Sequence, residues 1–279
     1  MTTHKCHPSV QNSLTDISNI RLHTFTNLTE LYLRDNQLTS LPTGIGSCVN
    51  LDSLYLENNL LTTLPATMGG LKNLKGLCLH RNQFVAAPLS LFDCVGLEEL
   101  YLDGNAITGC LPAELGNLVN LTELGLANNK LGEGSGGEAF PETIGLLKNM
   151  HTLHAESNQI VELPKNFGRC KAMRRLYLND NKMAKLHACI GKCPKLEIIN
   201  VEDNEINKLA KRIKDLPLLR FLLLANNKLV ALDFNPGECA PGLRRLSLAG
   251  NQLDEATMKL EKLNGMGGLD EGEEEREED

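Results

Sequence analysis

Two histidines in this 279-residue sequence stand at spacings that could pair each of them with a carboxylate. Asp103 follows His80 by 23 residues, and Glu156 follows His154 by two. An imidazole held against a carboxylate can act as a general base when the surrounding site shifts its pKa. Charged residues on an open, solvated sheet more often form a polar binding face, because they lack the enclosed pocket that such catalysis needs. We therefore expect a binding face and no catalytic residues.

These residues belong to a pattern that recurs along most of the chain. Its clearest copy, residues 51–61, reads Leu-x-x-Leu-x-Leu-x-x-Asn-x-Leu. Most copies are 23 residues apart, and the asparagine recurs ten times, as Asn36, Asn59, Asn82, Asn105, Asn129, Asn158, Asn181, Asn204, Asn227 and Asn251. Self-similarity at such a period is typical of stacked-repeat folds.

The Leu-x-Leu step predicts a short strand whose two leucines point to one side while the residue between them points to the other. A single copy cannot bury its leucines, but stacked copies bury them against one another in a continuous core. We therefore predict an α/β fold, a right-handed leucine-rich repeat solenoid with about ten parallel concave strands and short helical or 3-10 segments on the convex side. The asparagine amide is expected to bond backbone groups where the chain leaves each strand.

The repeats predict one elongated domain over residues 28–253, with an insertion near residues 132–138. Residues 1–27 would form an N-terminal cap, residues 254–268 a C-terminal capping helix, and residues 269–279 a disordered acidic tail. The apolar residues expected to cover the first repeat are Leu14, Ile17, Ile20 and Leu22. Four glycines in the insertion predict a flexible loop, which is either a partner contact or a tolerated insertion.

The cysteines point to a reducing compartment. Four of them stand three residues before a repeat opening, where most other repeats hold an apolar residue: Cys48, Cys94, Cys170 and Cys193. We expect these four to be buried and reduced, in a cytoplasmic protein with the nucleus as the alternative location. His4, Cys6 and His7 could suggest a metal, but no second ligand pair stands at zinc-site spacing, so we expect a frayed terminus, no metal and no cofactor.

Most repeats continue beyond the asparagine with Leu-Pro, as at residues 41–42, 64–65, 111–112 and 163–164. Proline cannot donate to a strand ladder and directs the chain off the sheet. With these features the chain resembles the intracellular leucine-rich repeat proteins of the 23-residue Leu-Pro class, which include Ras-associated scaffolds and Scribble-like polarity proteins. Residues 105–112 depart from that class toward the plant receptor style. The resemblance implies a scaffold in signal transduction, with small GTPases or other signalling components as partners.

If the leucines face inward, the residues between them line the concave face. All four tyrosines of the protein then share the middle position of that face. Tyrosines are frequent interface anchors, although stacking between strands could by itself explain the column. We predict partner binding by Tyr32, Arg34, Tyr55, Glu57, His80, Tyr101, Asp103, His154, Arg175, Tyr177, Phe221, Leu223 and Arg245.

An apolar patch is expected near the C-terminal end of the concave face, formed by Ile198, Phe221 and Leu223. Such a patch either binds a partner or is buried by the C-terminal segment. Both readings are consistent with the sequence.

Charge is distributed unevenly along the chain. Residues 165–228 hold 15 basic and 6 acidic residues, whereas the last ten residues hold eight acidic residues and one arginine. Two alternatives to a concave-face scaffold follow from this. One is an acidic-tailed nuclear adaptor or chaperone-like protein that binds basic partners. The other is a nucleic-acid binder acting through residues 165–228, which is less favoured because these lysines map largely to the convex side, where they form a solvated surface. We expect no membrane association.

Overall fold

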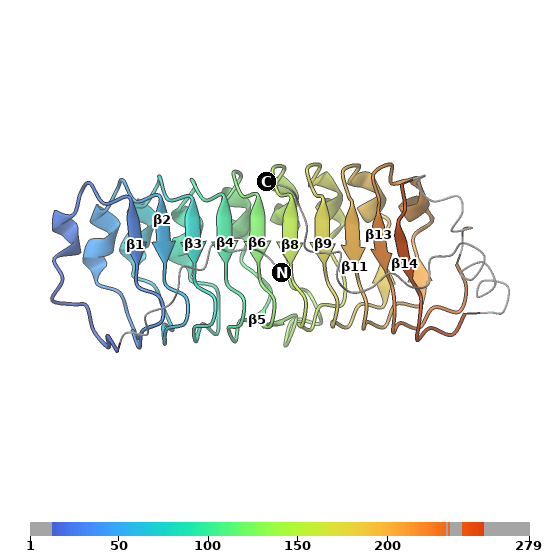
Figure 1. The fold of residues 1–279 in the computed structure, drawn as a ribbon, viewed down its shortest axis with the longest axis horizontal. Helices are drawn as coiled ribbons and strands as arrows, with labels where there is room; N and C mark the ends of the chain where they lie inside the picture. The colour runs from blue at the N-terminus through green and yellow to red at the C-terminus, as the bar shows by residue number, and fades with distance from the viewer. Residues whose placement is uncertain (1–12, 233, 235–241, 254–279) are drawn as a thin grey trace.

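The structure is a computed structural model of the chain, and it describes residues 13–232, 234 and 242–253. Ten strands form one parallel sheet along one side of the molecule, and the 3-10 turns lie behind it (Figure 1). The strands, in chain and sheet order, are β1 (Glu30–Tyr32), β2 (Ser53–Tyr55), β3 (Gly76–Cys78), β4 (Glu99–Tyr101), β6 (Glu123–Gly125), β8 (Thr152–His154), β9 (Arg175–Tyr177), β11 (Ile198–Asn200), β13 (Phe221–Leu223) and β14 (Arg245–Ser247). The predicted ten-stranded solenoid is confirmed.

Every strand pairs with the next one at equivalent positions of the repeat. Leu54 at the centre of β2, for example, aligns with Leu31 on β1 and with Leu77 on β3. Leu54 and Leu77 are fully buried, as the inward orientation of the leucines requires. The same register holds across the 29-residue repeat, where Leu124 aligns with Leu153.

The convex side is built from 3-10 turns, which confirms the prediction for that side. They are η1 (Leu22–Thr24), η2 (Thr43–Ser47), η3 (Ala66–Gly70), η4 (Leu89–Asp93), η5 (Ala113–Asn117), η6 (Glu142–Leu146), η7 (Lys165–Arg169), η8 (Ile190–Lys192) and η9 (Lys211–Asp215). A proline with φ between −63° and −70° immediately precedes each turn from η2 to η7. Proline fits this place because its φ is fixed and its missing N–H would have no partner there.

The core contains the four ladder cysteines together with the leucines. Cys48, Cys94, Cys170 and Cys193 are fully buried, as expected. The Cys48 thiol donates to the backbone oxygen of Leu22, one repeat earlier. These side chains therefore fill space in the core and link neighbouring turns.

The asparagine ladder closes the turn after each strand. The Asn59 side-chain nitrogen donates to the backbone oxygens of Leu56 at 3.0 Å and Leu33 at 2.9 Å, while its Oδ1 accepts the Leu38 N–H at 3.0 Å. The residue before each asparagine has a positive φ; besides Gly104 and Gly250 these are Asp35, Asn58, Arg81, Asn128, Ser157, Asp180, Asp203 and Asn226. The predicted role of the asparagines is confirmed, and their bonds tie successive repeats together.

The glycine-rich insertion is linked by hydrogen bonds within itself and to the next repeat, and its predicted flexibility stays a prediction. The Gly137 N–H donates to the Gly132 oxygen at 3.1 Å, and the Gly137 oxygen accepts the Val161 N–H at 3.1 Å. The insertion therefore forms a hydrogen-bonded turn that continues into the next repeat. Beside it, β5 (Thr108–Gly109) pairs with β7 (Lys130–Leu131); farther along, β10 (Lys185–Leu186) pairs with β12 (Lys208–Leu209).

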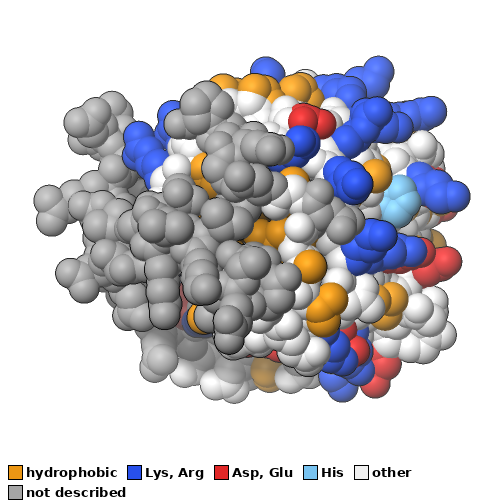
Figure 2. Space-filling model, turned by 90° about the vertical axis from the view of Figure 1, so that its right-hand side faces the viewer, with side chains coloured by type: hydrophobic (Ala, Val, Ile, Leu, Met, Phe, Trp, Pro, Cys, Tyr) orange, Lys and Arg blue, Asp and Glu red, His pale blue; other side chains and the backbone are white. Residues whose placement is uncertain are grey.

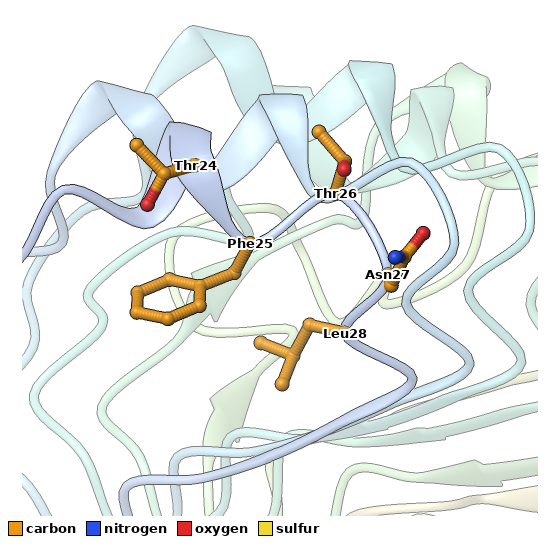
Figure 3. Close-up of a pocket in the computed structure, with 5 residues that line it drawn as sticks. All are labelled: Thr24, Phe25, Thr26, Asn27 and Leu28. Carbon is orange, nitrogen blue, oxygen red and sulfur yellow. The ribbon is translucent and has the colours of Figure 1, made fainter.

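The N-terminal end covers the first repeat only in part. Ile17 and Leu22 are buried, but Leu14 and Ile20 are 44% and 42% exposed, against expectation. An open cavity of about 350 Å³ lies at this end, lined by residues 24–28, with the Phe25 and Leu28 side chains pointing into it (Figure 3). Phe25 occupies the position that Cys48 and Leu71 fill in the next repeats, yet it is 48% exposed whereas they are fully buried.

The predicted capping helix, the acidic tail and the His4–His7 segment lie outside the described residues. Among the residues that the structure does describe, no helix has the length and apolar character needed to cross a bilayer.

Candidate ligand-binding face

The strand register places the middle concave residues of all ten repeats in one row. The row runs Tyr32, Tyr55, Cys78, Tyr101, Gly125, His154, Tyr177, Asn200, Leu223 and Ser247. All four tyrosines therefore lie in one column on one face, as the repeat register predicts. Whether the residues of this face bind a partner stays a prediction.

Neighbouring rings of this row stack where their strands are adjacent. The Tyr32 and Tyr55 ring centroids are 4.5 Å apart with planes 4° from parallel, and those of His154 and Tyr177 are 4.7 Å apart at 9°. The Tyr32 hydroxyl donates to Glu30 at 2.7 Å, which raises the pKa of Tyr32 to about 12. Tyr32 is 47% exposed, so a large aromatic surface faces solvent at this end of the row.

Tyr101 does not offer such a surface, because it is only 6% exposed. Its ring leans over Gly125 on the next strand, where an added Cβ would lie 2.9 Å from Tyr101 Cδ1. Burial and the nearby Glu123 and Glu99 carboxylates raise the pKa of the Tyr101 phenol. The prediction that Tyr101 is an exposed anchor is therefore wrong. Gly125 has no side chain, so the Tyr101 ring can pack against the sheet.

Four polar side chains meet at the centre of the face, and we name them the central polar cluster: Asp103, Glu123, His154 and Glu156. Asp103 stands just beyond β4, Glu123 at the start of β6, His154 at the end of β8 and Glu156 just beyond β8. His154 Nε2 lies 3.9 Å from Glu123 Oε1, and His154 Nδ1 lies 3.5 Å from Glu156 Oε1. Asp103 Oδ1 accepts the Ala127 N–H at 2.8 Å, so this carboxylate extends across β6 toward His154.

Burial dominates the electrostatics of the cluster and also those of Glu57, which lies just beyond β2. It raises the pKa of Asp103 to about 6, with smaller contributions from the Ala127 N–H and the His154 imidazole, which lower it, and from Glu156, which raises it. Burial likewise raises the pKa of Glu57, although Arg34 lies 3.8 Å away and opposes the shift. Both carboxylates are therefore held in surroundings that disfavour their negative charge.

Three polar atoms of the cluster are buried without a hydrogen-bond partner: Glu123 Oε1, His154 Nε2 and Glu156 Oε2. Glu57 Oε2, four strand spacings from β8, is likewise buried without a hydrogen-bond partner. Buried polar groups are nearly always bonded in native proteins, so a group of unsatisfied atoms marks a place where a partner group belongs.

The C-terminal third of the face is apolar and basic. Ile198 and Phe221 are partly exposed, whereas Leu223 is only 6% exposed. Ser247 Oγ donates to Glu202 Oε1 at 2.7 Å across β13, the strand that carries Leu223. Arg175 and Arg245 are partly exposed on the flanking strands of this region.

The predicted binding residues include Asp103 and His154 of this cluster; Glu156 was weighed only as a partner of His154, and Glu123 was missed as a site residue. The pairing of His80 with Asp103 stays a hypothesis, while Asp103 bonds the Ala127 N–H and its pKa responds to His154 and Glu156. The available signal was the pair of small residues Gly125 and Ala127, which leave room on β6 for longer side chains from both sides. In the described part of the chain, no group of His, Cys, Asp and Glu has a geometry suited to a metal ion.

Comparison with known proteins agrees with this fold. The family described as leucine rich repeat matches residues 26–84, and a second leucine rich repeat family matches residues 96–118. A leucine-rich repeat protein of Leptospira interrogans is 30% identical, with 89% of this chain and 74% of that chain covered and a TM-score of 0.58. The chain therefore belongs to the leucine-rich repeat family. A search of curated protein sequences finds no match.

Two further structures show how widely the fold is shared. The internalin InlF of Listeria monocytogenes is 21% identical over 93% of this chain and 70% of that one, with a TM-score of 0.76. The plant peptide hormone receptor RGFR1, solved in complex with RGF2, is 26% identical over 87% of this chain and 47% of that one, with a TM-score of 0.52. These neighbours support the repeat fold and leave the intracellular Leu-Pro subclass a prediction.

Proposed function

We propose that this protein is a non-catalytic protein-interaction module that binds an extended segment of a partner protein along its concave face. The observation that carries the proposal is the cluster of buried, unsatisfied polar atoms at the centre of an otherwise well-bonded sheet. Ten strands about 4.8 Å apart give a face roughly 43 Å long, which is long enough for an extended peptide.

The exposed aromatic surface supports the same proposal. Tyr32, Tyr55 and Tyr177 present ring faces with little side-chain freedom to lose on binding, because Tyr32 stacks on Tyr55 and Tyr177 stacks on His154. The receptor RGFR1 was solved with its ligand RGF2, so a protein with a similar repeat fold does take a peptide hormone ligand.

A scaffold in intracellular signalling is the finer form of this proposal. It draws on the Leu-Pro repeats and on the cysteines, since the seven cysteines in the described part of the chain are free thiols. Small GTPases or other signalling components are the partners that this form favours, in the cytoplasm or the nucleus. Fluorescence microscopy of the tagged protein and binding assays with GDP-loaded and GTP-loaded Ras-type GTPases test it.

A second candidate function is binding of a polyanion, such as nucleic acid, on the convex side. Lys and Arg side chains gather on one side of the C-terminal end (Figure 2). Lys192 lies in η8, and Lys211 and Lys214 lie in η9, as their expected convex position requires. A steep fall of nucleic-acid affinity with salt would support phosphate contacts there, and a flat dependence would exclude them.

Binding to a displayed peptide library tests the main proposal. The informative variant replaces Tyr32, Tyr55 and Tyr177 with alanine, leaving the buried Tyr101 in place. Its matched control replaces three exposed valines that follow η2, η4 and η5: Val49, Val95 and Val119. We expect peptides selected on the wild-type chain to bind the tyrosine variant at least tenfold more weakly and the control equally well. Equal binding to both variants would contradict a concave-face module.

A further inference from the structure

We propose that the central polar cluster holds one basic side chain, a lysine or an arginine, of the bound peptide. This inference rests on the proposed function, because the peptide would lie along the same face.

The sheet leaves room for longer side chains on the concave side of β6. Gly125 and Ala127 are the two concave residues at the end of β6 and just beyond it, and neither projects above the sheet. An added Cβ at Gly125 would lie 2.3 Å from Asp103 Oδ2, so the carboxylate already occupies the space of the missing side chain. Carboxylates from β4 and β8 and the His154 ring therefore meet over β6.

The cluster is rich in negative charge. It contains three carboxylates and one imidazole. His154 is 3.5 Å from one carboxylate and 3.9 Å from another, which is too long for a good hydrogen bond. A buried carboxylate oxygen without a donor is unfavourable, and a bound cation with several N–H groups would satisfy several such oxygens at once.

The unsatisfied atoms of the cluster are buried. Glu123 Oε1, His154 Nε2 and Glu156 Oε2 are each shut off from solvent and have no hydrogen-bond partner. They belong to β6 and to the end of β8, and the distances of 3.5 Å and 3.9 Å from His154 to the two carboxylates show that one bound side chain could reach all of them.

The shape of the cluster favours an organic cation over a metal ion. Asp103 and Glu156 stand on strands two positions apart, roughly 10 Å between backbones, which is wide for a metal but suits a guanidinium or ammonium group between them. The described residues also contain no group with metal-ligand geometry. The stacked rings of His154 and Tyr177 border the space and offer an aromatic surface to the alkyl stem of the basic residue.

The neighbouring surface limits where this basic residue stands in the ligand. Three strand spacings separate β8 from β13, where Phe221 is partly exposed. That distance, roughly 14 Å, corresponds to about four residues of extended chain. The expected ligand therefore has a basic residue and an apolar residue separated by about three others.

Selection of a displayed 12-residue peptide library on the full-length chain tests the inference. We expect the selected peptides to share one lysine or arginine. Replacing that residue with the isosteric, uncharged citrulline or norleucine should weaken binding at least tenfold in fluorescence anisotropy. In the protein, Asp103→Asn and Glu156→Gln should each weaken the binding of the basic peptide at least fivefold. The control, Glu162→Gln, changes an exposed carboxylate outside the concave rows and should have little effect.

The outcomes separate the inference from the proposed function. Selected peptides that depend on Tyr32, Tyr55 and Tyr177 but carry no shared basic residue would overturn the cation site and leave the binding face intact. Peptides that bind independently of that face, or no selected peptide at all, would contradict both. If a protein variant unfolds in circular dichroism, the citrulline comparison on wild-type protein still decides.

Discussion

Asp103 accepts the backbone N–H of Ala127 at 2.8 Å, so a carboxylate from one repeat bonds the backbone of the next one. This single bond holds a carboxyl group in a largely buried place, against its preference for water. It is possible because Gly125 presents no side chain where the Asp103 carboxylate lies. The contact therefore affects both the stability of the solenoid and the charge of its concave face.

The first prediction is that the free protein becomes more stable as Asp103 takes up a proton. Its pKa is raised to about 6 in the folded state from 3.8, so the folded state binds the proton more tightly than the unfolded state. The destabilising effect is full above pH 6 and disappears as the pH falls through 6 toward 3.8. A shift of that size corresponds to about 2–3 kcal/mol at most. Urea unfolding of wild type and Asp103→Asn at pH 8, 6 and 4 measures it.

We expect Asp103→Asn to be the more stable protein at pH 8, with the difference shrinking toward pH 4. The variant also separates stability from binding, because the same change should weaken the binding of a basic peptide. Unfolding free energies that run parallel for the two proteins at all three pH values would show that Asp103 does not titrate in this way.

The second prediction concerns the asparagine ladder. Asn158 is 4% exposed and donates to the backbone oxygens of Leu126 at 3.0 Å and Glu156 at 3.1 Å, while its Oδ1 accepts the Leu131 N–H at 2.9 Å. Asn158→Ala leaves these buried groups unbonded and should lower the free energy of unfolding by about 3 kcal/mol. The control is Asn120→Ala, which removes one exposed bond to Val95 and should change stability by less than about 1 kcal/mol. Chemical denaturation compares them, and equal losses would argue against the ladder.

The third prediction is a graded reactivity of the thiols. Cys110 is exposed, whereas Cys94 and Cys170 are fully buried, with burial raising their pKa values to about 11 and about 12. In a Cys6→Ser/Cys239→Ser background, a thiol reagent at pH 7.5 should modify Cys110 well before the other thiols, because Cys110 is the exposed one, although burial and Glu138 raise its pKa as well. Mass spectrometry of tryptic peptides identifies the modified residues. Rapid modification of Cys94 or Cys170 would contradict their place in the core.

The fourth prediction tests the order of the glycine-rich insertion. Gly136 and Gly137 both have positive φ, at 69° and 90°, but only an added Cβ at Gly137 would meet a neighbour, Val161 Cγ2 at 2.1 Å. Gly136→Ala should destabilise the protein by about 1 kcal/mol through backbone strain alone. Gly137→Ala should destabilise it by clearly more, since the next repeat must move as well. Thermal unfolding distinguishes the two, and indistinguishable values would indicate a loose loop.

The departures from expectation have a common origin in neighbouring side chains. Tyr101 occupies a concave position like that of Tyr32, yet it is nearly buried while Tyr32 is 47% exposed. Tyr101 can lean because Gly125 is beside it, whereas the Tyr32 ring is stacked against Tyr55. The insertion is hydrogen-bonded to the next repeat, because the Val161 N–H donates to the Gly137 oxygen. None of these contacts lies within one repeat, so a repeat consensus does not contain them.

The sequence alone determined the coil, the register and the contents of each row, because a leucine period of about 23 residues can bury its apolar side chains only by stacking in that alignment. The tertiary structure decided which side chains of each row are exposed to solvent and which pack against the sheet. The exposure of each side chain depends on the space left by residues one or two strands away. The meeting of Asp103 with the β8 residues His154 and Glu156 over β6 is of this second kind: the spacing places all three on one face, but only the assembled sheet brings their charged groups together.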